Sequence, residues 1–231
     1  MPACRAGKLF PSKNIPALSS SRLYAIRIGL FVLVFAWAIG LLYFTRPEPP
    51  PAELVRVTIP EGYNVRQIGA ALEKAGMFSS EEFVEAAKAE EGFLFPDTYE
   101  FFKHSSPSTV IGKMKENFEK KVGREVERNI VIMASLLEEE AAKPEDWKII
   151  SGILWKRLAA GIPLQVDAEP ETYDYLGFPP APISNPGLEA IGAALHPSTS
   201  PYLYYLSDKD GNLHYSRTFE EHVEKKLKYL R

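Results

Sequence analysis

The chain has 231 residues, of which 45% are hydrophobic, 12% aromatic and 25% charged. This length and composition allow one or two packed domains, and they exclude a large multidomain enzyme and a chain that is disordered throughout. Residues 1–46 carry six of the 27 basic residues and none of the 30 acidic ones, so the rest of the chain has a net charge of −9. This charge argues against binding to a phosphate backbone, and nucleic acid is not an expected partner.

The N-terminal part is basic and then strongly apolar. Ile28–Thr45 contains 18 residues without a charge, which is about the length of one membrane crossing. The basic residues before it favour a cytoplasmic N-terminus. A cleaved signal peptide is the alternative, but the run is longer than a usual signal core and its Ala-x-Ala triplet lies inside it. We therefore expect a cytoplasmic tail (1–27), an uncleaved transmembrane helix (28–45) and a body outside the cytoplasm. The only cysteine, Cys4, falls in the tail.

A proline-rich stretch, 46–53, is expected to be a short, stiff linker to a small β-α-α-β module at 54–103. Leu54–Ile59 alternates as a strand does. Two helices are expected next, from Asn64 to Gly76 and from Ser79 to about residue 90, because each starts with a capping residue that is followed three positions later by Gln or Glu. The aromatic segment 92–101 then returns as an extended chain.

A second domain is expected at 108–231. Helical patterns cover about 108–121, 125–142 and 145–160, and a hairpin at 202–206 and 213–216 precedes a last helix that starts near Thr218. Between them, residues 164–201 contain seven prolines, which predict extended and turning loops of the kind that often line binding sites. The expected fold class is α+β.

The most informative segment is Ile130–Lys143. Apolar side chains cover nearly every side of Ile130–Leu137, so this helix should run through a core, and it continues into three consecutive glutamates. Of these, Glu138 is the best placed for chemistry, because it lies beside small alanines on the helix. Desolvation, neighbouring like charges and the helix C-terminus should all raise its pKa, as a general acid needs. The alternative is a solvated helix end without function.

Several polar residues follow in the proline-rich region, and Gln165, Asp167, Tyr173 and Asn185 are candidate carbohydrate ligands. The four histidines show no close pairing of the zinc-hydrolase type, and Ser135 lacks the surroundings of a nucleophilic serine. We therefore expect chemistry driven by an acid, with no metal or cofactor.

Ordered sequence blocks resemble the endolytic murein transglycosylases of the YceG-like type. The blocks are Glu91–Tyr99, Ala134–Glu140, Leu164–Asp167, Gly177–Ile183 with Asn185–Gly187, Ala193–Pro197 and Tyr202–Tyr205 leading to His214 and His222, with a weaker match at Val57–Gly62. The resemblance implies a bacterial inner-membrane protein with one transmembrane helix, a LysM-like module and an outward-facing catalytic domain that cuts nascent glycan strands. It also suggests proximity to penicillin-binding proteins.

The family's catalytic glutamate corresponds to Glu138. By this resemblance, Glu138 would cleave the β-1,4 bond between N-acetylmuramic acid and N-acetylglucosamine without water and leave 1,6-anhydro ends, while Gln165, Asp167 and Tyr173 would bind the sugar. The chain departs from the family between Asp167 and Tyr173, where a much longer loop is usual, and Glu171 replaces the usual asparagine. Two other functions stay open: a noncatalytic, membrane-anchored peptidoglycan-binding protein, and a hydrolase that uses the same acid.

Overall fold

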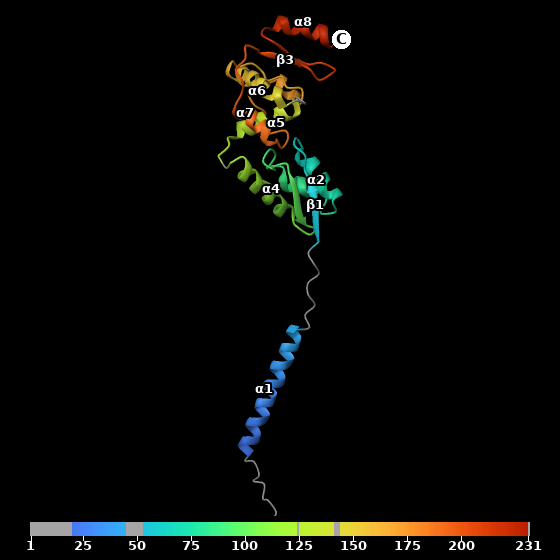
Figure 1. Cartoon of the computed structure of the whole chain (residues 1–231), viewed down its shortest axis with the longest axis vertical. Coiled ribbons are helices and arrows are strands. Elements are labelled where there is room, and N and C mark those ends of the chain that lie inside the picture. The colour runs from blue at the N-terminus through green and yellow to red at the C-terminus, as the bar shows by residue number, and fades with distance from the viewer. Residues whose placement is uncertain (1–19, 45–52, 124, 141–143, 231) are drawn as a thin grey trace, which may run out of the picture. The chain divides into compact units, whose positions relative to one another are not determined.

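The computed structural model describes residues 20–44, 53–123, 125–140 and 144–230 (Figure 1). The chain divides into two compact units, Met1–Pro51 and Ala52–Arg231. Helix α1, Ser20–Phe44, belongs to the first unit. No helix in the described ranges is both long enough and apolar enough to cross a membrane, and the transmembrane helix predicted at 28–45 stays a prediction. Cys4, most of the predicted tail and most of the predicted linker lie outside the described residues.

The second unit begins with the expected β-α-α-β order. Strand β1, Leu54–Thr58, pairs antiparallel with β2, Thr98–Phe102. Between them lie α2, Val65–Lys74, and α3, Ser80–Ala87. Both predicted helix starts are confirmed: Asn64 and Gln67 form a capping box, and the Ser79 hydroxyl accepts a hydrogen bond from the Glu82 N–H. The extended segment predicted at 92–101 becomes a strand only from Thr98, and the likeness to LysM stays a prediction.

A first hydrophobic core forms between this sheet and its helices. Ile68 and Leu72 of α2 lie one turn apart and are fully buried, as is Phe83 of α3. Helix α4, Pro107–Lys121, starts at the capping residue Ser106 and adds its own apolar side chains to this core, whereas its Phe118 belongs to a second core. Helix α4 therefore joins the two cores, and the predicted domain limits, 54–103 and 108–231, stay predictions.

The second core surrounds α5, Arg128–Glu140. Its residues from Val131 to Leu137 are all buried, as the apolar pattern predicts. Helix α6, Pro144–Ala159, and helix α7, Leu188–Leu195, pack against α5. The sequence predicts only loops across 164–201, and this prediction is wrong at Leu188–Leu195, which forms α7. The predicted end of the α5 helix, residues 141 and 142, falls outside the described ranges.

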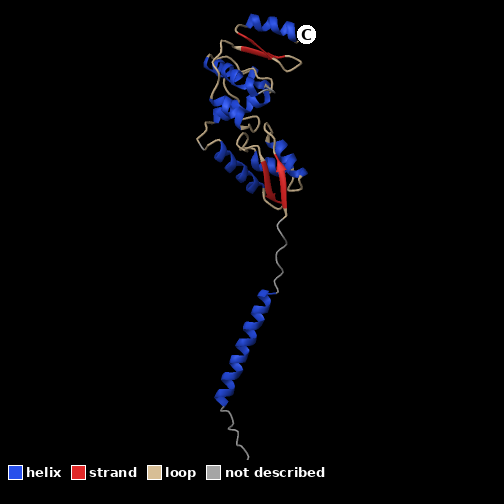
Figure 2. Cartoon of the chain, in the orientation of Figure 1, coloured by secondary structure: helices blue, strands red, loops and turns tan. Residues whose placement is uncertain are grey.

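The remaining elements follow the predicted order (Figure 2). A short 3₁₀ turn, η1, covers Pro170–Tyr173 within the proline-rich region. Strands β3, Tyr204–Ser207, and β4, Leu213–Ser216, form the expected antiparallel hairpin. Helix α8, Phe219–Tyr229, starts at Thr218, whose hydroxyl accepts a hydrogen bond from the Glu221 N–H, and packs against both strands. Together with the helices, these small sheets confirm the α+β class.

Candidate active site

Helix α5 leaves the second core at Glu138, which is half-buried. One of its carboxylate oxygens, Oε2, accepts a hydrogen bond of 3.0 Å from the backbone N–H of Gly187, at the start of α7. Gly187 also leaves space for Glu61, since a Cβ on this glycine would lie 2.0 Å from Glu61 Oε1. The Glu138 carboxyl therefore lies between the end of α5, the start of α7 and the loop that follows β1.

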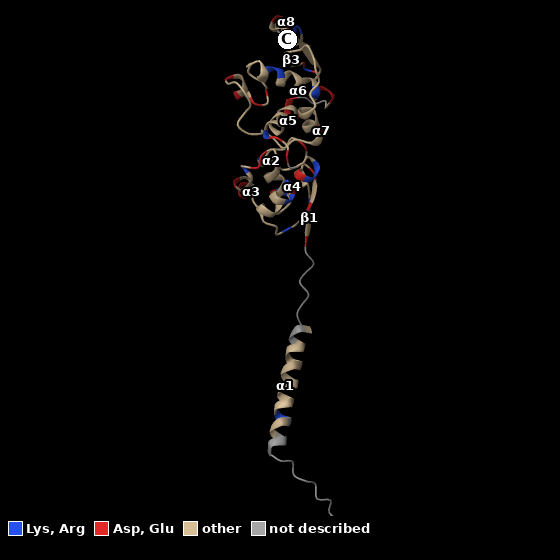
Figure 3. Ribbon diagram, turned by 90° about the vertical axis from the view of Figure 1, so that its left-hand side faces the viewer, with Lys and Arg blue, Asp and Glu red and all other residues tan. Residues whose placement is uncertain are grey.

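Burial raises the pKa of Glu138 to about 7, and the negative charges of Glu61, Glu139 and Glu189 act in the same direction. The hydrogen bond from Gly187 opposes this rise without cancelling it. The raised pKa predicted from the sequence is confirmed, with desolvation as the main cause. A carboxyl with this pKa keeps a proton near neutral pH and can donate it to a leaving group. Figure 3 shows the acidic residues in red, including those at the end of α5.

A second carboxyl, Glu140, faces a different space. It lines a cavity of about 460 Å³ between the end of α5, the proline-rich region, the β3–β4 hairpin and α8, and Glu138 does not line this cavity. Burial raises the pKa of Glu140 to about 7, and the charge of Asp167 adds to the rise, while the Tyr205 hydroxyl acts against it. The helix end thus presents two proton-holding carboxyls to two different surroundings.

The sequence-predicted ligands Gln165, Asp167 and Tyr173 all line the cavity of Glu140. The Tyr173 hydroxyl donates a hydrogen bond of 2.6 Å to Asp167 Oδ1. Thr172 closes the short segment between them, because its hydroxyl accepts from the Val166 N–H and donates to the Glu169 carbonyl. The shortened loop therefore has a defined structure. It brings the three predicted ligands together with Glu140 rather than with Glu138.

Gln165 and Arg157 also line this cavity. Gln165 has a φ of 52°, a left-handed conformation that a residue with a side chain rarely adopts. Such conformations are often found at functional sites. Arg157 of α6 is buried, and its guanidinium donates to the carbonyls of Leu164 and Leu203 at 2.6 and 2.8 Å. Arg157 therefore holds the segment before Gln165 against the segment that leads into the hairpin.

Asn185 does not serve as the carbohydrate ligand expected from the sequence. It is fully buried, and its side chain donates to the Tyr63 carbonyl and to Glu91 Oε1 and accepts from the Leu94 N–H. Glu91 in turn accepts from the Val65 N–H at the start of α2. Asn185 and Glu91 thus join the first and second cores and leave no group free for a sugar.

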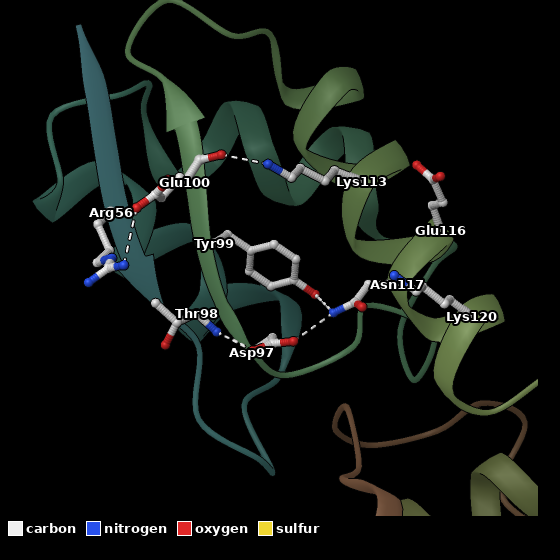
Figure 4. Close-up of a pocket in the computed structure, with 9 residues that line it drawn as sticks. All are labelled: Arg56, Asp97, Thr98, Tyr99, Glu100, Lys113, Glu116, Asn117 and Lys120. Carbon is white, nitrogen blue, oxygen red and sulfur yellow. Dashed lines mark hydrogen bonds and ion pairs between the residues drawn. The ribbon is translucent and has the colours of Figure 1, made fainter.

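A second cavity, of about 450 Å³, lies between β2 and α4 (Figure 4). Several of its polar and charged groups pair with one another. Arg56 forms an ion pair with Glu100 at 3.1 Å, and the Asn117 amide donates hydrogen bonds to Asp97 and to the Tyr99 hydroxyl. None of the predicted site residues lines it. Within the described part of the chain, no group of three or more His, Cys, Asp or Glu side chains is arranged to hold a metal ion.

Two half-buried carboxyls with a pKa of about 7, of which Glu140 lines a polar cavity with tyrosine walls, define a site suited to acid catalysis on a polar ligand. The model of the YceG-like family matches residues 43–170 and 171–228, and the chain belongs to this family. The resemblance seen in the sequence blocks is therefore confirmed.

Two curated relatives are both named endolytic murein transglycosylase. The protein of Bacillus subtilis is 27% identical over an alignment of 237 positions that covers 76% of this chain and 65% of that protein. The protein of Streptococcus pneumoniae is 25% identical over an alignment of 245 positions that covers 76% of this chain and 44% of that protein. The chain thus spans less than two thirds of the length of these relatives. The crystal structure of a yceG-like protein from Listeria monocytogenes matches with a TM-score of 0.64 and 27% identity over 76% of each chain.

Several residues of this site were missed by sequence reasoning. Glu140 was visible only as part of a run of glutamates, and its burial depends on the proline-rich segment that folds over it. Tyr205 and Arg157 come from a hairpin and a helix that the sequence predicts separately. Glu61 follows β1 in the weakest of the matching blocks. In each case the missing information was the tertiary packing.

Proposed function

We propose that the protein is an endolytic peptidoglycan lytic transglycosylase that cleaves the β-1,4 bond between N-acetylmuramic acid and N-acetylglucosamine in nascent glycan strands. The observation that carries the proposal is Glu138, a half-buried carboxyl with a pKa of about 7 at the family's catalytic position. The family membership and the names of the relatives support the same reaction class.

In the proposed mechanism, Glu138 donates its proton to the glycosidic oxygen as the bond breaks. The oxocarbenium charge that develops at C1 of the muramic acid is captured by the 6-hydroxyl of the same sugar, and Glu138 takes the proton of that hydroxyl. A 1,6-anhydro end forms without added water, and Glu138 regains its starting state. One carboxyl suffices here, whereas most glycosidases use two. Gln165, Asp167 and Tyr173 are proposed to bind the sugar in the cavity that they line.

Location and partners belong to the same proposal. The charge-free run 28–45 supports a single membrane anchor in the bacterial cytoplasmic membrane, with the second unit outside the cytoplasm. Peptidoglycan synthases of the penicillin-binding type are the expected neighbours. Cell fractionation tests the anchor, and recovery in the soluble fraction contradicts it. Crosslinking in the membrane tests the neighbours, and capture of no synthase contradicts that part.

The product ends distinguish this function from its alternatives. The full chain in detergent is incubated with uncrosslinked glycan strands, and the products are identified by mass spectrometry. Anhydro ends are the expected result. Reducing ends would instead indicate a hydrolase, in which water replaces the 6-hydroxyl. Intact strands that still bind the protein would indicate a noncatalytic peptidoglycan-binding protein.

A further inference from the structure

The loop that follows β1 lies against the end of α5. The Gly62 N–H donates to the Asn185 carbonyl, and the Asn185 N–H donates to the Tyr63 carbonyl, both at 3.0 Å. A Cβ on Gly62 would lie 3.3 Å from Cγ of Glu138, so the backbone of the loop passes beside the proposed acid. Gly62 has a φ of 79°, a conformation that favours glycine. The β-α-α-β module therefore forms one side of the Glu138 site.

Glu61 brings a second carboxylate to this site. Gly187 donates its N–H to Glu138 Oε2 at 3.0 Å, and a Cβ on the same glycine would lie 2.0 Å from Oε1 and 2.6 Å from Oε2 of Glu61. Both carboxylates thus lie against one residue. Gly187 has a φ of −78° and a ψ of 175°, an extended conformation open to any residue. The space that Glu61 occupies, rather than the backbone conformation, is therefore what requires a glycine here.

Electrostatics shows what this arrangement does. Burial is the main cause of the raised pKa of Glu138, and among the neighbouring charges Glu61 raises it most. Glu139 of the same helix and Glu189 of α7 add to the rise, and all three charges are negative. In the proposed mechanism, Glu138 holds a proton at the start and takes one back at the end. A neighbouring carboxylate favours the protonated state at both points.

We propose that Glu61 is a positioning residue of the active site, whose carboxylate, lying against Gly187, keeps Glu138 in the state that donates a proton. This inference rests on the proposed function for the reaction itself. It goes beyond that function because it assigns part of the catalytic arrangement to the β-α-α-β module, which the sequence resemblance describes only as LysM-like.

Glu61→Gln tests the role of the charge, because it nearly keeps the shape of an exposed side chain. Loss of the charge should lower the pKa of Glu138 from about 7 by about one pH unit. We expect kcat/KM for the formation of anhydro ends by the full chain in detergent to fall about tenfold at pH 8 and less than about twofold at pH 5.5, where Glu138 is mostly protonated in both proteins. Glu73→Gln, at an exposed glutamate of the same module, is the matched control and should keep the wild-type pH profile.

Gly187→Ala tests the geometry while the charge of Glu61 stays. The added Cβ must displace the Glu61 carboxylate, whereas the backbone N–H that binds Glu138 is kept. We expect the pH profile to move in the same direction as in Glu61→Gln. In the double variant, Gly187→Ala should add no further shift, because the charge that it displaces is already gone.

Direct titration of Glu138 separates this inference from the proposed function. The carboxyl is followed by NMR in protein with isotope-labelled glutamate carboxyls, and Glu138→Gln identifies its signal. The same Glu138 pKa in the wild type and in Glu61→Gln would overturn the inference, whether or not strands are cut. Equal falls in kcat/KM at pH 5.5 and pH 8 would also overturn it, because they would indicate a merely structural role. A lowered pKa in a protein whose wild type forms no anhydro ends would contradict the proposed function and leave the inference standing.

Discussion

Glu138 and Glu140 are two residues apart in one helix, yet their surroundings differ completely. The sequence predicts the raised pKa of Glu138 correctly, because burial of its helix is the main cause and the adjacent Glu139 adds to it, although the charges of Glu61 and Glu189 come from distant segments. It does not predict the burial of Glu140, which depends on Asp167 and Tyr205 from distant segments. The spacing of about 100° per residue places the two side chains on nearly opposite sides of the helix, and only the packing decides what each side meets.

Glu91 gives a prediction at the same scale. Its carboxylate accepts hydrogen bonds from the Val65 N–H and from the Asn185 amide, so Glu91→Ala leaves both donors without a partner. We expect the free energy of unfolding to fall by about 1–3 kcal/mol. Chemical denaturation measures this change, with Glu224→Ala on the exposed side of α8 as the control. Equal stability of the two variants would show that the junction around Asn185 adds little.

At the scale of elements, the capped helices and the alternating strands were predicted well. The β-α-α-β order, the long helices and the hairpin all follow from local signals such as the Asn64–Gln67 capping box. Helix α7 was missed because prolines on both sides suggested an irregular loop, although Leu188–Leu195 contains the apolar residues that pack on α5. A short helix between prolines carries too few periodic positions to stand out.

The contact of α6 with the segment before the hairpin gives a second prediction. A Cβ on Gly152 would lie 2.1 Å from the Ser198 carbonyl oxygen, and the Ser198 N–H already donates to the Lys148 carbonyl of the same helix. Gly152→Ala must therefore push backbone away from backbone, and we expect a loss of about 1–3 kcal/mol or more.

Gly112→Ala in α4 is the matched control, because nothing lies within 4 Å of its added Cβ. This control should be neutral or slightly stabilising, since alanine favours a helix more than glycine does. The midpoints of thermal unfolding compare the two variants. A Gly152→Ala protein as stable as the control would mean that α6 and the Ser198 segment can separate without loss.

For the whole molecule, three half-buried carboxyls set the dependence of stability on pH. Burial raises the pKa of Glu91, Glu138 and Glu140 from an ordinary 4.5 to about 7. Between these values the folded chain binds more protons than the unfolded chain, so the folding stability should fall as the pH rises from about 5 to about 8. Burial lowers the pKa of His222, so this one residue makes the folding stability rise with pH, opposite to the three carboxyls.

Thermal unfolding at pH 5.5 and pH 8 measures this effect. The midpoint should be higher at pH 5.5, and the difference should shrink in a Glu138→Gln, Glu140→Gln double variant, which lacks two of the titrating groups. A midpoint that rises from pH 5.5 to pH 8 would contradict the assignment of raised pKa values to these carboxyls.

The most direct measurement of the central claim compares the wild type with Glu138→Gln on uncrosslinked glycan strands at pH 7. The amide keeps the shape of the side chain but has no proton to donate as an acid, so we expect anhydro ends from the wild type and a loss of at least about 100-fold in their rate of formation in the variant. Strand binding should persist, because Glu138 does not line the cavity with the proposed sugar ligands. Anhydro ends formed by Glu138→Gln at the wild-type rate would contradict the account.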